Sequence, residues 1–589
     1  MRHSAANSSL GSQASRALGW SFAGNLTSRL GTLAIGIVLA RLLGPHAFGA
    51  FAVALVAMLA VLSFNDLGVS LAIVRWEGEP AEIAPTVATV CLASSLVIYA
   101  GCFLAAPAFA SAMGAPAAAG VIRILALNVV VDGFVATPAA LLQRYFRQDR
   151  KMIADQVNCW LGAAVSVGLA WRGMGAMSLA AGRLSGAAAS GILFMAFSPE
   201  PVRFGFDRAR ARALFRFGLP LAGSSLIVFA VANADQLVVG HLLGGTALGF
   251  YALALNLASW PVNMFSMPVR AVAPAVFARL QHDRPAMRAG FLSAAGLLGS
   301  VTMPVCVLIC GAAAPLLAVA YGPQWLPAAH ALRWLALLGA LRIIFELVYD
   351  FFVVLARSRV LCTVQLVWLV VLVPALIAGS RAAGIAGAGM AEVAVAACVV
   401  LPWYLSELTK VGISRRALAA RLWLPLVVAA GVGAAAAAAA RTIPVSLAAL
   451  AAGGVLALAA IGLLGYWARD AISSLRPVLG RRPAAPGGAG VAGPPAGAVA
   501  ANPGAARAGP PPLAACRDVT GPLPVYRELA EPGPGPRPAV RVRTGPHPAA
   551  ASAGPLPVYQ ATVAALSWDP GRAGQGGREL AMRRGRHAR

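Results

Sequence analysis

The chain has 589 residues, of which 59% are hydrophobic and 12% are charged. A soluble protein carries about 25% charged residues, so this composition excludes an ordinary soluble enzyme. The formal net charge of +26 would suggest a nucleic-acid partner in a soluble protein. Here the basic residues lie mostly between apolar runs, where they report membrane topology, and we expect no nucleic-acid partner.

Apolar runs of about 20 residues, long enough to cross a hydrocarbon core as helices, recur from Trp20 to Trp467. They predict an all-α polytopic membrane protein with about fourteen transmembrane helices. The predicted helices are 21–43, 48–74, 83–110, 117–142, 152–171, 175–197, 217–243, 247–278, 290–320, 328–356, 360–379, 384–408, 422–440 and 445–467. The short polar segment 1–19 precedes them, and we expect no cleaved signal peptide.

The basic residues divide unevenly between alternate loops. With the N-terminus placed in the cytoplasm, the external loops hold only Arg41, Arg172, Arg381 and Arg441, while the cytoplasmic loops and their adjoining helix ends hold 19 Lys and Arg residues. The positive-inside rule therefore predicts an even number of helices, with both termini cytoplasmic, in a bacterial cytoplasmic membrane.

An internal repeat divides the helices into two groups. Residues 38–54 (VLARLLGPHAFGAFAVA) and 238–254 (VVGHLLGGTALGFYALA) align at an offset of 200. The identical pairs are Val38/Val238, Leu42/Leu242, Leu43/Leu243, Gly44/Gly244, Ala47/Ala247, Gly49/Gly249, Ala52/Ala252 and Ala54/Ala254. An even number of helices separates the copies, so the repeat is parallel. We predict an N-lobe over 20–212, a C-lobe over 213–411 and two further helices over 412–470, with substrate bound between the lobes.

The segment 471–589 differs in composition. It is rich in Pro, Ala, Gly and Arg and poor in large apolar residues, which predicts a disordered cytoplasmic tail. The hexapeptide GPLPVY occurs at Gly521–Tyr526 and again at Gly554–Tyr559. The repeated hexapeptide is either the result of sequence duplication and drift in a low-complexity tail, or a short docking motif in the extended polyproline conformation. The positive charge of the tail also permits contact with anionic membrane lipids.

Ionisable residues inside membrane helices are costly and therefore mark candidate sites. Their depth favours Arg29, Arg123 and Arg270 as cavity residues that meet an anionic substrate, because guanidinium groups match phosphate oxygens. For each arginine the alternative is an ion pair between helices or a side chain that extends to the membrane interface. Asn25 adds polarity beside these arginines. Asp235 lies in the outer half of its helix and is a candidate acidic residue of the cavity. Asp66 either faces the cavity or accepts hydrogen bonds from backbone N–H groups at a helix end. The remaining candidates are Asp132, Arg183, Arg333, Arg342, Glu346, Asp350 and Glu392; of these, Arg342 and Glu346 are spaced to pair with each other.

The sequence contains no catalytic constellation. There is no GxSxG, P-loop, HExxH or ligand-spaced Cys/His cluster, so we expect a protein that is not an enzyme and has no metal site or cofactor.

The stretch Leu18–Arg75, with ARLLGPHAFGAFA and LGVSLAIVR, resembles the amino-terminal region of Wzx-type polysaccharide or O-antigen flippases. These belong to the multidrug/oligosaccharidyl-lipid/polysaccharide exporter superfamily. The second half repeats the likeness in ADQLVVGHLLGGTALGFYALALNLASWPV and PVRAVAPAVFARL, and the resemblance covers about residues 15–470.

The resemblance implies a two-lobed transporter that moves a polyprenyl-pyrophosphate-linked oligosaccharide across the cytoplasmic membrane by alternating access. It implies that Arg29 and Arg270, with Arg123, meet the pyrophosphate or an anionic sugar, and that Asp235 serves proton or sodium coupling. The tail departs from the family pattern and suggests docking of a polysaccharide polymerase or glycosyltransferases. Three alternatives stay open: a lipid II flippase, a small-molecule exporter of the same superfamily, or a membrane scaffold for polysaccharide synthesis enzymes.

Overall fold

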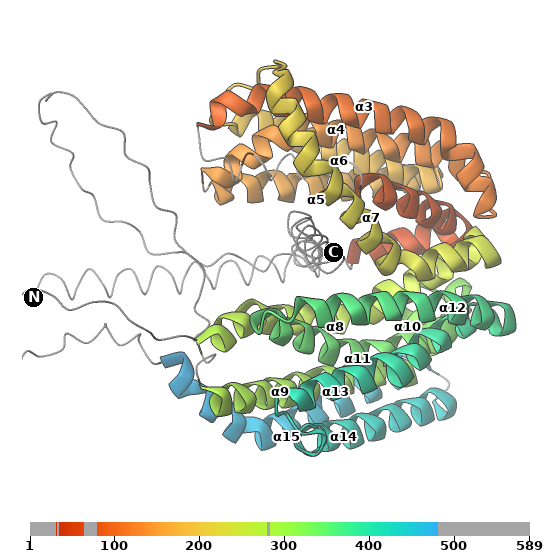
Figure 1. The fold of residues 1–589 in the computed structure, drawn as a ribbon. Coiled ribbons are helices and arrows are strands. Elements are labelled where there is room, and N and C mark those ends of the chain that lie inside the picture. The colour runs from red at the N-terminus through yellow and green to blue at the C-terminus, as the bar shows by residue number, and fades with distance from the viewer. Residues whose placement is uncertain are drawn as a thin grey trace, which may run out of the picture. The chain divides into compact units, whose positions relative to one another are not determined.

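A computed structural model describes residues 31, 34–63, 73, 79–145, 147–279, 283–443 and 445–480 (Figure 1). These residues are helical apart from short connections. The first helical run is Ala34–Ser63. It is followed by α3 (Pro80–Ala112), α4 (Ala118–Arg144), α5 (Gln148–Trp171), α6 (Ala176–Phe197), α7 (Arg208–Leu243), α8 (Gly245–Arg279), α9 (Arg284–Gly311), α10 (Ala313–Ala320), the 3₁₀ turn η1 (Pro323–Trp325), α11 (Ala328–Val354), α12 (Ser358–Val395), the π turn η2 (Ala396–Val400), α13 (Leu401–Lys410), α14 (Arg415–Thr442) and α15 (Ser446–Gly480).

Eight of the described helical segments are long and apolar enough to cross a membrane. With no strand among the described residues, this confirms the predicted all-helical, multi-span fold class. We refer to residues 34–197 as the first half and residues 208–410 as the second half.

Side-chain caps set several helix starts. Asp207 accepts hydrogen bonds from the backbone N–H groups of Ala209 and Arg210 at the start of α7. Asp283 and Ser414 accept in the same way at the starts of α9 and α14. Each cap satisfies a backbone donor that has no partner within its own helix.

The repeat is visible in the backbone. Gly44 has φ +70° inside the run Ala34–Ser63, and Gly244 has φ +85° between α7 and α8. Positive φ is a conformation that glycine adopts without steric cost. The two repeat copies therefore make the same left-handed turn at equivalent positions.

Several boundaries differ from the prediction. The helix predicted over 290–320 is divided at Ala312, because Pro315 near the start of α10 has no N–H for the preceding turn. The helices predicted over 360–379 and 384–408 join into one run, kinked at Ala383 and Gly384. The helix α15 continues to Gly480, beyond the predicted end at Trp467 and into residues 471–480, which were assigned to the tail.

The largest buried cluster extends through both halves, and part of it lies along α8, α9 and α11, which run side by side (Figure 1). At its centre, Phe351 of α11 packs edge-on against Phe277 of α8, with ring centroids 5.4 Å apart, and lies 4.8 Å from the ring of Phe291 of α9. Aromatic pairs of this geometry add about 0.5–1.5 kcal/mol beyond the area they bury. These helices are thus a rigid support for the polar residues described next.

Candidate functional site

Four of the six predicted cavity residues cannot be assigned side-chain contacts. Arg29, Asn25 and Asp66 lie outside the described residues, and Arg270 is described only as a backbone position in α8. Arg123 and Asp235 are fully described.

Arg123 of α4 is engaged with the neighbouring helix α3. Its Nε donates a hydrogen bond of 3.2 Å to the carbonyl oxygen of Phe103. Its guanidinium carbon lies 4.2 Å from the centre of the Phe103 ring, which is a cation–π contact. The guanidinium is therefore held against α3 in this conformation.

Two nearly buried carboxylates lie in the second half. Asp235 of α7 is 5% exposed and Glu392 of α12 is 8% exposed. They interact electrostatically with each other and with Arg342 of α11. Arg342 is also paired with Glu346, with 3.6 Å between Nε and Oε1, as their i, i+4 spacing predicted. Three carboxylates thus share one guanidinium among the described side chains.

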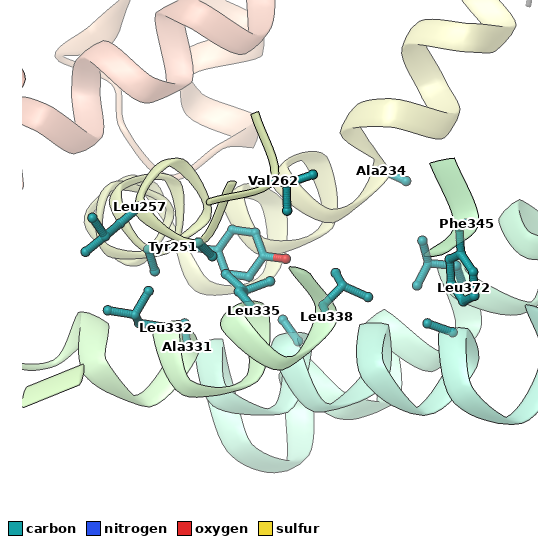
Figure 2. Close-up of a cluster of buried hydrophobic side chains, with 14 of the residues drawn as sticks. Ala234, Tyr251, Leu257, Val262, Ala331, Leu332, Leu335, Leu338, Phe345 and Leu372 are labelled. Carbon is teal, nitrogen blue, oxygen red and sulfur yellow. The ribbon is translucent and has the colours of Figure 1, made fainter. Parts of the chain in front are cut away.

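Tyr251 of α8 lies against the same group. Its ring is fully buried beside Asp235, and its hydroxyl makes no hydrogen bond of standard geometry with a described residue. Figure 2 shows the Tyr251 ring between its own helix and the side chains of Leu335 and Leu338 of α11. The Tyr251 hydroxyl thus lies close to the Asp235 carboxylate, although the two do not form a hydrogen bond of standard geometry.

Charge balance determines what this group can do chemically. An ionised carboxylate without a counter-charge is very costly away from water. Arg342 carries a single positive charge beside the two buried carboxyl groups of Asp235 and Glu392. A proton held on one of these carboxyl groups would balance the remaining charge.

A second charged pair lies in the first half. Asp132 of α4 and Arg183 of α6 interact electrostatically, but none of the ion pairs among the described residues joins them. Both side chains are exposed although they lie well inside their helices. Charged groups at such depth are expected to face water or a polar ligand rather than lipid.

The helical position of these residues shows which way they face. On α6, Leu179, Ala180, Gly186 and Ala187 lie three or four residues from Arg183 and are all buried. They share its face of the helix. On α4, Asn128 and Val129 bear the same relation to Asp132 and are also buried.

These two charges are thus exposed next to buried positions of their own helices. We call Asp132 and Arg183 the α4–α6 pair. Both were among the candidates from the sequence, but their pairing across two helices could not be predicted.

At one set of helix ends, the backbones of the two halves pack directly against each other. A methyl group added to Gly249 would lie 2.8 Å from Cα of Gly49, and one added to Gly49 would collide with the carbonyl oxygen of Gly245. Nearby, Nδ1 of His241 in α7 donates to the carbonyl oxygen of Ala112 at the end of α3, over 2.9 Å. We call this contact zone, formed by residues 40–49, 112–115, 240–249 and 319–325, the closed end.

These spans, buried charges and paired halves define an all-helical, multi-span membrane protein. Comparison with solved structures agrees. The fold is similar to lipid II flippase MurJ in an inward closed conformation, with a TM-score of 0.62 and 12% identity over 76% of this chain and 99% of that one. It is also similar to an inward-facing MATE family transporter of the MOP superfamily, with a TM-score of 0.52 and 18% identity over 65% of this chain and 95% of that one. At these identities the likeness shows the fold alone.

Sequence comparison identifies the family. Residues 38–330 match the polysaccharide biosynthesis protein family. The chain is 30% identical to the succinoglycan biosynthesis transport protein ExoT of Rhizobium meliloti (strain 1021) over 328 residues, which are 55% of this chain and 65% of that one. It is 25% identical to the lipopolysaccharide biosynthesis protein WzxC of Escherichia coli (strain K12) over 392 residues, covering 66% and 80% respectively.

Over residues 38–330, the chain therefore belongs to the polysaccharide biosynthesis protein family. Its relatives are transporters and flippases rather than enzymes, in agreement with the prediction from the sequence.

Proposed function

We propose that the protein is a flippase that carries a polyprenyl-pyrophosphate-linked oligosaccharide across the cytoplasmic membrane for exopolysaccharide or other envelope glycan synthesis. The two lobes, 20–212 and 213–411, alternate between states open to opposite sides of the membrane. The glycan and pyrophosphate pass between them while the polyprenyl chain stays in lipid.

The observation that carries the proposal is the exposed α4–α6 pair on buried helix faces. A protein whose interior met only lipid or apolar side chains would have no use for charges at that depth. A glycan offers hydroxyl groups that donate to a carboxylate and accept from a guanidinium. Names of the relatives, which refer to succinoglycan transport and lipopolysaccharide biosynthesis, support a glycan substrate.

Residue roles follow from charge and depth. Arg29 and Arg270 bind the pyrophosphate, with Asn25 beside them, and the α4–α6 pair binds sugar hydroxyls. The buried carboxylates Asp235 and Glu392 carry the coupling proton or sodium ion, with Asp66 as a further acidic position.

Orientation and the tail belong to the same proposal. Both termini lie in the cytoplasm, because the basic loops alternate with loops that hold few arginines. The tail, with its two copies of GPLPVY, recruits a polysaccharide polymerase or glycosyltransferases.

The proposal is tested by lipid analysis after depletion of the protein and, separately, after deletion of residues 481–589. Depletion is expected to cause accumulation of an undecaprenyl-linked oligosaccharide on the cytoplasmic face, and its mass identifies the glycan. Accumulated lipid II instead would assign the protein to that substrate. The absence of any lipid-linked intermediate would overturn the flippase proposal, and a defect confined to the tail deletion would indicate a scaffold.

A further inference from the structure

A short segment of the second half inserts into the closed end. The segment Tyr321–Pro327, which contains η1, connects α10 to α11. Trp325 within it has none of its surface exposed. Its indole Nε1 donates a hydrogen bond of 3.0 Å to the carbonyl oxygen of Ala40, in the first half.

The Trp325 ring touches aromatic residues of both halves. Phe48, from the first half, lies edge-on at 5.4 Å between ring centroids and an interplanar angle of 89°. Phe250 of α8 lies at 5.8 Å and 87°. Tyr321 closes the group at 6.4 Å. A single side chain is thus shared by the two halves.

Arg41 makes the reciprocal contact. From the first half, its guanidinium donates to the carbonyl oxygens of Ala320, over 2.7 Å, and of Val319. Both carbonyls lie at the end of α10. In return, the Gln324 side-chain amide donates to the Arg41 carbonyl oxygen over 3.4 Å. Side chains of each half therefore cap helix ends of the other.

The chemistry of these contacts makes them reversible. The last carbonyl groups of a helix have no partner within it, and water can satisfy them as well as a side chain can. Separation of the halves would expose helix ends that tolerate exposure, without breaking a hydrogen bond inside any helix. Gly322, with φ +101° and no atom within 4 Å of an added methyl group, leaves room for the segment to turn.

We propose that Trp325 and Arg41 form a plug and latch that hold the closed end shut and release when that end opens. The inference rests on the proposed alternation between two states. With the predicted topology, the closed end is the extracytoplasmic side, so the latch keeps the pathway sealed from outside while substrate loads from the cytoplasm. The Trp325 ring supplies the apolar seal and the Arg41 guanidinium supplies the polar cross-link.

The test is labelling of a cysteine placed at a buried position next to the closed end. Val53 has none of its surface exposed and lies beside Gly245, so Val53→Cys is a suitable reporter in a transport-competent background whose native cysteines are replaced. A membrane-impermeant maleimide is added from outside intact cells. We expect Trp325→Ala and Arg41→Gln each to raise the labelling rate at least fivefold.

Matched controls come from the same chain. Trp171, at the end of α5, is 85% exposed, and its neighbour Arg172 is also exposed. Trp171→Ala and Arg172→Gln should leave labelling at the starting rate. Trp325→Phe keeps an aromatic ring but loses the hydrogen bond to Ala40, and it should give an intermediate rate.

The outcomes separate this inference from the proposed function, because labelling requires no knowledge of the substrate. Unchanged labelling in folded Arg41→Gln and Trp325→Phe proteins would overturn the plug and latch, even if lipid-linked glycan transport is demonstrated. Raised labelling in both, without any glycan transport, would support the latch and remove the flippase proposal alone. Size-exclusion profiles identify variants that fail to fold.

Discussion

Gly49 and Gly249 occupy equivalent positions in the two copies of the repeat and pack backbone against backbone. An added methyl group at Gly249 would lie 2.8 Å from Cα and 2.9 Å from N of Gly49. Such an approach is available only to glycine, which has no Cβ. The repeat therefore brings its own equivalent positions into contact, and the contact can be tested by adding a single carbon.

Gly49→Ala should open the closed end. The new methyl group collides with the carbonyl oxygen of Gly245, and overpacking of this kind costs about 1–3 kcal/mol. Labelling of Val53→Cys from outside should rise, and the thermal stability of the purified protein should fall. Gly36→Ala is the control, because an added methyl group there meets no atom within 4 Å. Equal behaviour of the two variants would contradict close packing at Gly49.

Asp235→Asn and Glu392→Gln should uncouple transport from its driving gradient. Neither amide can take up or release a proton, and neither carries the charge that attracts a cation. In proteoliposomes, uphill transport driven by an imposed proton or sodium gradient should be lost while downhill exchange persists. Glu82→Gln serves as the control, because Glu82 pairs with Arg210 at 3.7 Å on the surface. Gradient-driven transport at normal rates in both variants would exclude a coupling role.

Asp132→Asn and Arg183→Gln should each reduce transport at least tenfold, which corresponds to about 1.4 kcal/mol of lost substrate interaction. The exchange variant Asp132→Arg with Arg183→Asp separates a substrate contact from a structural ion pair. If these residues bind glycan hydroxyls, exchange does not restore transport, because the donor and acceptor positions are reversed. Recovery of transport in the exchange variant would show that the pair is structural.

Arg123→Gln should have a small effect on transport. The loss of its cation–π contact with Phe103 is worth about 0.5–1 kcal/mol at an accessible site, and it should appear as a modest drop in thermal stability. Arg123→Lys, which keeps the positive charge, should lose less stability. A severe loss of transport with unchanged stability would instead support the cavity role predicted from the sequence.

Arg29→Gln and Arg270→Gln should abolish transport without loss of folded protein. Each change removes the fork of N–H donors that matches phosphate oxygens while it keeps much of the side-chain bulk. Transport assays are paired with membrane expression levels, and Arg381→Gln, in a predicted external loop, serves as the control. Normal transport in both variants would remove these arginines from the substrate site.

The sequence by itself determined the features that depend on local composition. Apolar length predicted the helices, because a backbone in hydrocarbon must satisfy its hydrogen bonds within each segment. The repeat identified Gly44 and Gly244 as equivalent positions, and both have positive φ in the structure. Spacing on one helix predicted the pairing of Arg342 with Glu346. Each of these relations lies within a few residues or follows from chain periodicity.

Tertiary structure decided which distant residues meet. Asp235 and Glu392 share Arg342 because α7, α11 and α12 belong to one packed group, a relation that hydropathy does not encode. The burial of Trp325 against Ala40 depends on contact between helix ends far apart in the chain. Intramembrane charge marks a residue as important, but its partner is set by helix packing, which depends on the shapes of many side chains at once.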